Sequence, residues 1–130
     1  MEITVGTSRS REVIDITEKI ESNLGGSGIA GVFVKHTTAA VTTADLDPGT
    51  DLDYLDAIES MTPVKKWRHP HDPPHFPDHL WASFIGPGVM LPFHDGKLQL
   101  GAWQRVILIE LDGPRERAIA VTILTADEER

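Results

Sequence analysis

The sequence predicts an α+β domain in which mainly antiparallel sheets form a sandwich-like core with a few short helices. Three observations support this class. The β-branched runs at residues 28–43 and 104–111 lack a helical period. Asp95–Gly96 joins two alternating runs in the way that a hairpin turn does. Expected strands also outnumber helices, and hairpins outnumber crossovers, so the strands are expected to pair antiparallel.

The N-terminal third predicts an edge strand, a short helix and a longer extended segment. Residues 2–5 alternate between polar and apolar side chains and predict the edge strand. The helix follows, and it ends at Gly25–Gly26. Its apolar stripe consists of Ile16, Ile20 and Leu24. Residues 28–43 then form either one long strand or two strands joined by a bend near His36–Ala39.

Two helices are expected in the middle of the chain. Residues 47–61 have apolar side chains at helical spacing and acids in the first turn, where the helix dipole favours them. This helix should end before Pro63. A shorter helix is expected over residues 77–86, which begin with a proline that suits a first turn and end with a glycine.

The C-terminal part predicts strands. Residues 89–103 form a hairpin around Asp95–Gly96, and the apolar run 104–111 is expected to extend it. That run looks covered on both faces, which in so small a domain indicates packing against another subunit. After a turn at residues 112–114 comes a last strand with one apolar face. That face consists of Ile119, Val121 and Ile123.

The length and charge of the chain restrict the kinds of function and partner that are expected. One domain is expected to span residues 1–130. Twelve basic and twenty acidic side chains give 12 − 20 = −8, which argues against a nucleic-acid partner. The sequence shows neither a leader nor an apolar run long enough for a bilayer, so a cytoplasmic protein with no membrane partner is expected. Without cysteine, any metal must bind nitrogen and oxygen ligands.

The segment KKWRHPHDPPHFPDHL, residues 65–80, is the most unusual part of the chain. It contains four of the six histidines and four of the nine prolines. Proline restricts the backbone and removes a donor, so the segment should follow an irregular and fairly rigid path. Such a path suits a metal or acid/base site, but it also fits a solvated loop rich in histidine.

Neutral imidazoles are good zinc ligands, and three of them leave the open position that a catalytic metal needs. His69 and His79 lie ten positions apart, and His36 is distant from both, so only the fold can bring them together. In the segment GAWQR, the amide of Gln104 and the guanidinium of Arg105 stand in a strand that is otherwise apolar. They either face solvent or contact a substrate.

Several long motifs support a resemblance. They are HTTAAVTT, WRH, PDHLWASFIGP and LPFHDGKLQLGAWQRVILIELDGPRER, with REVIDIT near the N-terminus. Over nearly the whole chain the sequence resembles the YjbQ-like family, also labelled secondary thiamine-phosphate synthase. The resemblance implies a small α+β homotrimer whose clustered histidines hold a metal near the subunit interface. It also implies a transferase that joins a pyrimidine diphosphate to a thiazole phosphate.

Carried over by position, the resemblance assigns the metal ligands, with zinc as the expected divalent ion. These ligands are His36, His69 and His79, whereas His71 and His75 count as local extras. Where relatives place Asn-Glu-Asn, this chain has Ala44-Asp45-Leu46-Asp47. Asp45 is therefore the expected catalytic base, and Gln104 and Arg105 complete the expected catalytic set.

Three functions stay open at this point. The first is a metal-dependent enzyme acting on a small phosphorylated or heterocyclic substrate. The second is a non-catalytic homotrimer in which the same histidines form a structural or storage site. The third is an interaction module with a histidine-rich loop. An open coordination position beside a pocket favours the enzyme, and a saturated ion favours the structural protein.

Overall fold

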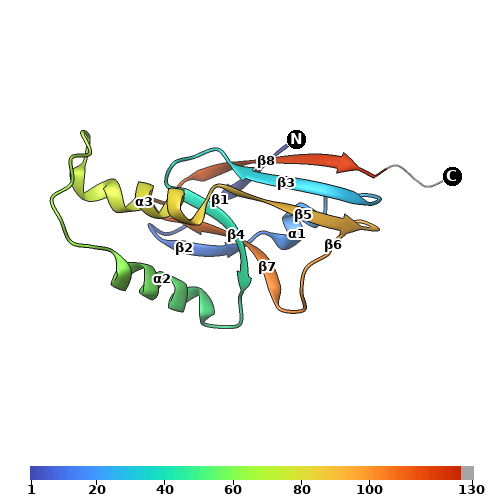
Figure 1. Cartoon of the computed structure of the whole chain (residues 1–130), viewed down its shortest axis with the longest axis horizontal. Coiled ribbons are helices and arrows are strands. Elements are labelled where there is room, and N and C mark those ends of the chain that lie inside the picture. The colour runs from blue at the N-terminus through green and yellow to red at the C-terminus, as the bar shows by residue number, and fades with distance from the viewer. Residues whose placement is uncertain (127–130) are drawn as a thin grey trace.

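Two antiparallel sheets, stacked face to face, form the body of the protein (Figure 1). A computed structural model describes residues 1–126. The elements in chain order are β1 (Glu2–Gly6), β2 (Glu12–Asp15), α1 (Thr17–Glu21), β3 (Gly28–Val34), β4 (Ala39–Asp45), α2 (Thr50–Met61), the 3-10 turn η1 (Pro73–His75), α3 (Phe76–Ile85), β5 (Gly88–His94), β6 (Lys97–Leu98), β7 (Gln104–Glu110) and β8 (Glu116–Thr125). The predicted α+β class is confirmed.

The larger sheet has five strands in the order β1-β8-β3-β5-β6, and the smaller has three in the order β2-β7-β4. Residues 28–43 form two strands rather than one, with the bend at the predicted place. Asp95 and Gly96 both have positive φ, of 48° and 73°, as the predicted hairpin turn requires. The predicted continuation of this hairpin into residues 104–111 is wrong, because β7 pairs with β2 and β4 in the smaller sheet.

Strand β7 separates two apolar clusters. Val106 and Leu108 point into the space between the sheets and pack with Val32 and Val121 of the larger sheet. Alternate residues of the same strand point to the opposite face. There Ile107 belongs to the second cluster, together with buried residues of α2 and α3. The chain therefore covers both faces of β7 itself, so the burial of this strand is not a sign of packing against another subunit.

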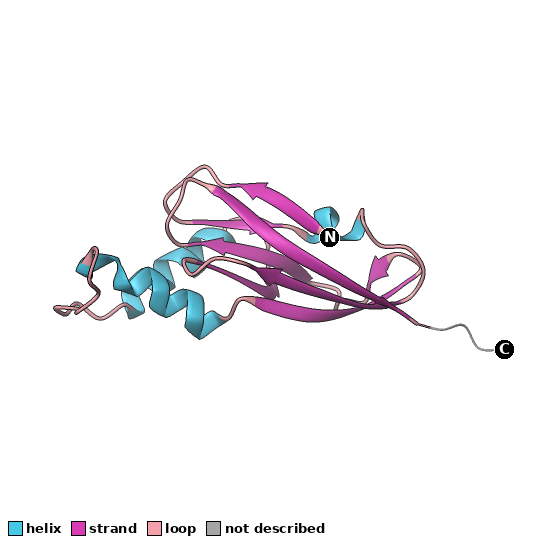
Figure 2. Ribbon diagram, turned by 90° about the horizontal axis from the view of Figure 1, so that it is seen from above, coloured by secondary structure: helices cyan, strands magenta, loops and turns pink. Residues whose placement is uncertain are grey.

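Two of the helices, α2 and α3, lie together at one end of the sandwich, whereas α1 packs against β7 away from them. Figure 2 shows α2, α3 and the loop that joins them at the end opposite the C-terminus of β8. The packing partners differ, since α2 lies against β2 and α3 lies against β4. The histidine-rich segment is this joining loop and the first turns of α3. Among residues 1–126, no helix combines the length and apolar character that crossing a membrane requires.

Candidate metal centre

The proline-rich segment delivers two histidines to one face of α3. Pro73 and Pro74 open the 3-10 turn, which runs directly into α3 at Phe76. Pro77 lies in the first helical turn, where its missing N–H has no helical partner to lose. His75 and His79 are therefore one helical turn apart and project from the same side. The helix ends at Gly86, whose φ is 108°.

Three imidazoles converge at this place. The ring centroids of His69 and His79 are 4.7 Å apart, and those of His75 and His79 are 5.0 Å apart. One ring nitrogen of each of the three lies within 4.8 Å of the others, and all three side chains are half-buried. Nitrogens of a tetrahedral zinc shell lie about 3.4 Å apart, so the rings would move together on binding. We call His69, His75 and His79 the histidine cluster.

The ring of His79 is oriented for coordination. Its Nδ1 lies 3.1 Å from the carbonyl oxygen of Thr37. A carbonyl only accepts, so Nδ1 carries the proton and donates it, which leaves the lone pair on Nε2. Metal-binding histidines commonly donate their second ring nitrogen to a carbonyl in this way. The bend between β3 and β4 thus fixes the tautomer of a ligand on α3.

Two carboxylates flank His75. Its Nε2 lies 2.8 Å from Asp112 Oδ2 and 3.3 Å from Asp78 Oδ2, and these three residues form a second group with metal-ligand spacing. Within residues 1–126 this buried nitrogen nevertheless has no hydrogen-bond partner. A buried ring nitrogen without a hydrogen bond is a group that a cation could satisfy. The side chains present therefore fit a divalent metal.

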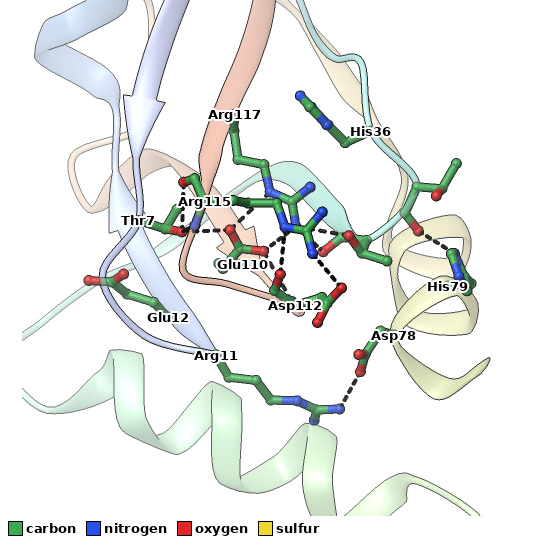
Figure 3. Close-up of polar contacts among 12 residues, drawn as sticks. Thr7, Arg11, Glu12, His36, Asp78, His79, Glu110, Asp112, Arg115 and Arg117 are labelled. Carbon is green, nitrogen blue, oxygen red and sulfur yellow. Dashed lines mark hydrogen bonds and ion pairs between the residues drawn. The ribbon is translucent and has the colours of Figure 1, made fainter. Parts of the chain in front are cut away.

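Both carboxylates are already paired with arginines. Arg11 Nη2 lies 2.8 Å from Asp78 Oδ1, and Arg115 Nη2 lies 2.8 Å from Asp112 Oδ2 (Figure 3). Burial raises the pKa of Asp78 above its usual value, although Arg11 acts in the opposite direction. Because their charge is partly neutralised, the carboxylates are better suited to orient His75 than to bind a cation in place of the imidazoles.

A buried ion pair supports the turn that carries Asp112. Arg117 Nε donates to Glu110 Oε1 at 2.9 Å, and its Nη2 donates to the carbonyl oxygen of Thr38 at 3.0 Å (Figure 3). Burial alone would raise the pKa of Glu110, but hydrogen bonds from Arg117, Thr7 and the Asp112 amide hold it below its usual value. The pair connects β7, β8 and the β3–β4 bend beside the histidine cluster.

His36 is not positioned as the predicted metal ligand. Its Nε2 accepts a hydrogen bond from the Ala118 amide at 2.9 Å, so the neutral ring carries its proton on Nδ1. Neither nitrogen then has a free lone pair. Burial, together with the charges of Arg117 and Arg115, lowers the pKa of His36 and keeps the ring neutral. The structure thus brings together His69 and His79 as expected and places His75 with them instead of His36.

The predicted catalytic residues Asp45, Gln104 and Arg105 lie at the end of the smaller sheet that is far from the histidine cluster. Asp45 is paired with Gln104 at one end of the β4–β7 ladder, and Ala39 is paired with Glu110 at the histidine end. Six residues of extended strand separate the two ends by roughly 20 Å. Gln104 Oε1 accepts the Gly101 amide, and Arg105 pairs with Asp15 and Glu18. In a single chain, these side chains therefore cannot meet a substrate held at the histidine cluster.

A pocket of about 520 Å³ opens beside the cluster. His79 belongs to both, and His36 lines the opposite wall from the β3–β4 bend. Thr37 and Ser83 add hydroxyl groups to a lining that is otherwise largely apolar, with Phe76 among its members. A few polar groups in an apolar hollow of this size are typical of small-molecule sites.

Comparison with known proteins places the chain in a family. The family model described as "UPF0047 protein YjbQ-like" matches residues 1–126. The chain belongs to this family. The UPF0047 protein of Archaeoglobus fulgidus is 36% identical to this YjbQ-like chain over 126 residues, which cover 95% of this chain and 100% of that protein. The UPF0047 protein YugU of Bacillus subtilis is 29% identical over 130 residues, covering 94% of this chain and 96% of that protein.

Solved structures share the YjbQ-like fold over nearly their whole length. A YbjQ-like protein of unknown function from Sulfolobus solfataricus P2 superposes with a TM-score of 0.85 and 38% identity, covering 97% of this chain and 96% of that chain. A hypothetical protein from Aeropyrum pernix K1 gives a TM-score of 0.86 and 37% identity, covering 97% and 98%. The predicted family and fold are confirmed.

Sequence reasoning missed three residues of this centre. The resemblance makes His75 a local extra, and it gives Asp78 and Asp112 no role. One signal was available for the first of these, because His75 and His79 are four positions apart and would share a face if the helix began early. No sequence spacing connects either residue to Asp112, which only the fold brings to the cluster.

Proposed function

We propose that this YjbQ-like protein is a metal-dependent enzyme whose histidine cluster holds a divalent ion, zinc, next to the substrate pocket. The observation that carries the proposal is the convergence of three imidazoles at the rim of a pocket of about 520 Å³. Three nitrogen ligands leave a coordination position for a substrate. When bound, zinc polarises a phosphoryl or carbonyl oxygen of the substrate.

The residues around the pocket have separate roles in this proposal. His79 would bind the ion through Nε2, while Thr37 fixes its ring. His36, neutral and protonated on Nδ1, would donate a hydrogen bond to a substrate oxygen from the opposite wall. Phe76 and Leu80 would exclude water from the reacting groups. Such a site suits a small substrate with a polar end and a flat apolar body.

The candidate reaction is of the thiamine-phosphate-synthase type, as the family resemblance implies. The same resemblance supports a homotrimer. Exposed apolar side chains on the outer face of the larger sheet agree with subunit contact there, since Phe33, Met90 and Leu124 are 51%, 72% and 62% exposed. Asp45, Gln104 and Arg105 could take part in catalysis only if a neighbouring copy brought them to the histidine cluster.

A second candidate is a non-catalytic trimer with a structural or storage metal. The nearness of Asp112 and Asp78 to His75 favours it, because a carboxylate could close the coordination shell. Zinc content and X-ray absorption of the purified protein would separate the candidates. One zinc per chain with three histidines and an exchangeable ligand supports the enzyme. A shell saturated by protein ligands supports the second candidate, and failure to load zinc at neutral pH contradicts both.

A further inference from the structure

A serine, a histidine and an aspartate form a hydrogen-bonded chain at the end of the sandwich opposite α2 and α3. Ser27 directly precedes β3, and His94 and Asp95 lie where β5 turns into β6 (Figure 1). Ser27 Oγ lies 2.9 Å from His94 Nδ1, and Asp95 Oδ2 lies 3.3 Å from His94 Nε2. Strand β3 spans roughly 20 Å between this group and the bend that contacts His79. The group is therefore separate from the candidate metal centre.

The hydrogen bonds of this group determine where each proton lies. The Asp95 amide donates to Ser27 Oγ at 3.4 Å, so the hydroxyl proton of Ser27 is left to be donated to His94 Nδ1. The Asp95 carboxylate only accepts, and it therefore favours the ring tautomer that carries its proton on Nε2. Nδ1 then faces the hydroxyl with its lone pair. A nucleophile, its base and a group that orients the base have this arrangement in acyl-transfer enzymes.

The backbone around Ser27 leaves room for an acyl group. Gly25 and Gly26 precede the serine, and a side chain at Gly25 would meet nothing within 4 Å. Within residues 1–126, the amides of Gly25 and Ser27 donate no hydrogen bond to another backbone group. The amide of a nucleophile and the amide two positions before it can together bind a developing oxyanion. The Gly96 amide donates to the Gly26 carbonyl oxygen at 2.9 Å, which connects this loop to the β5–β6 turn.

Exposure decides which acyl compounds can react at this place. The side chains of His94 and Asp95 are 68% and 85% exposed. Water screens the effect of an exposed carboxylate on the imidazole, so the base receives less help than it would in a buried site. Only a leaving group that departs with little protonation suits such a base, and the aryloxide of an aryl ester is of this kind.

We propose that Ser27, His94 and Asp95 form an acyl-transfer site that hydrolyses small aryl esters of carboxylic acids. Ser27 Oγ attacks the carbonyl carbon while His94 Nδ1 takes the hydroxyl proton. The bond from this carbon to the aryl oxygen then breaks, and the proton passes to the departing oxygen, which leaves an ester on Ser27. Water gives a proton to the same nitrogen and attacks this ester, so the carboxylic acid is released and the proton returns to Ser27.

The probe is p-nitrophenyl acetate, added to the full chain after treatment with a chelator so that no metal-bound water contributes. We expect hydrolysis above the rate in buffer, and Ser27→Ala and His94→Gln should each reduce the excess rate at least about tenfold. Asp95→Asn should reduce it less, because the carboxylate is screened and asparagine tolerates the positive φ of 48° at this position. The matched controls Ser22→Ala and His71→Gln, both at exposed positions, should not change the rate.

A fluorophosphonate would locate the nucleophile, because it forms a stable bond to an activated serine with loss of fluoride. Peptide mass mapping that finds the label on Ser27, and finds it lost in His94→Gln, would support the site. Equal hydrolysis rates in Ser27→Ala and Ser22→Ala would overturn it, and so would a label that is absent from Ser27 or is unaffected by His94→Gln. Circular dichroism of each variant would show that the fold is retained. Zinc loading bears on none of these outcomes, so the site is tested separately from the proposed metal centre.

Discussion

His75 Nε2, at the end of η1 just before α3, lies 2.8 Å from Asp112 Oδ2 in the turn between β7 and β8. This contact joins the histidine-rich loop to the strand framework. Arg115 holds the same carboxylate oxygen, and the Asp112 amide donates to buried Glu110. The Asp112 side chain and backbone are thus both held by the β7–β8 part of the chain.

Replacing Asp112 with asparagine should weaken zinc binding about 10- to 100-fold, the usual effect of losing a charged group that lies beside a metal-binding histidine. Competition with a chromophoric chelator would measure the affinity. The control is Asp95→Asn, because Asp95 lies 3.3 Å from the exposed ring of His94 in the hairpin. Equal affinities for the two variants would mean that Asp112 does not orient His75.

Single histidine replacements test the ligand set. His75→Ala and His79→Ala should each reduce zinc loading steeply, since each removes one of three nitrogens. His36→Ala should leave loading unchanged, because Nε2 of His36 is engaged by the Ala118 amide. His94→Ala, in the exposed hairpin turn, is a second control. Elemental analysis after dialysis would measure the content, and loss of zinc in His36→Ala with retention in His75→Ala would restore the set inferred from sequence.

The fold was largely predictable because alternation and turn signals depend on neighbouring residues. The β7 run was correctly recognised as a strand with two buried faces. Its partners were not, since a pattern of period two shows which face is buried but not which strand lies beside it. The two helices that cover its outer face were themselves predicted, but nothing local in the sequence joins them to β7.

The site was only partly predictable for a similar reason. His69 and His79 were assigned by resemblance, and the structure brings them together. His36 occupies a motif position, yet its ring turns toward the β8 backbone, a contact 82 positions away in sequence. His75 joined the cluster because the prolines direct the 3-10 turn straight into α3. Such a path depends on several dihedral angles at once and cannot be inferred from composition.

Removing one partner of the buried pair of Arg117 and Glu110 should destabilise the fold strongly. Both side chains are almost completely buried, at 1% and 0% exposed. Arg117→Met would leave the Glu110 carboxylate buried without its countercharge, which costs about 3–5 kcal/mol of unfolding free energy. Lys35→Met is the matched control, because the exposed pair of Lys35 with Glu2 contributes at most about 1 kcal/mol. Urea unfolding would measure both, and similar losses would contradict the role of the buried pair.

His36 should make stability depend on pH near neutrality. Burial and the charges of Arg117 and Arg115 lower its pKa in the folded chain, so the unfolded chain takes up the proton first as pH falls. The stability that neutral His36 contributes is therefore complete above its ordinary pKa of about 6.5. It is lost as pH falls from there toward the lower pKa of the folded chain.

Urea unfolding of the metal-free protein at several pH values would test this, with His36→Gln as the informative variant. A glutamine can still accept the Ala118 amide but does not titrate, so the loss of stability between about pH 7.5 and pH 5 should be smaller than in the unmodified chain. His94→Gln removes an exposed histidine and should keep the original pH dependence. The pKa values of Glu110 and Asp15 are lowered, so both carboxylates stay ionised in this range. Their protonation affects the free energy of unfolding only at more acidic pH. If the free energy of unfolding changed with pH equally in His36→Gln and in the unmodified chain, protonation of His36 would not be the cause of the pH dependence.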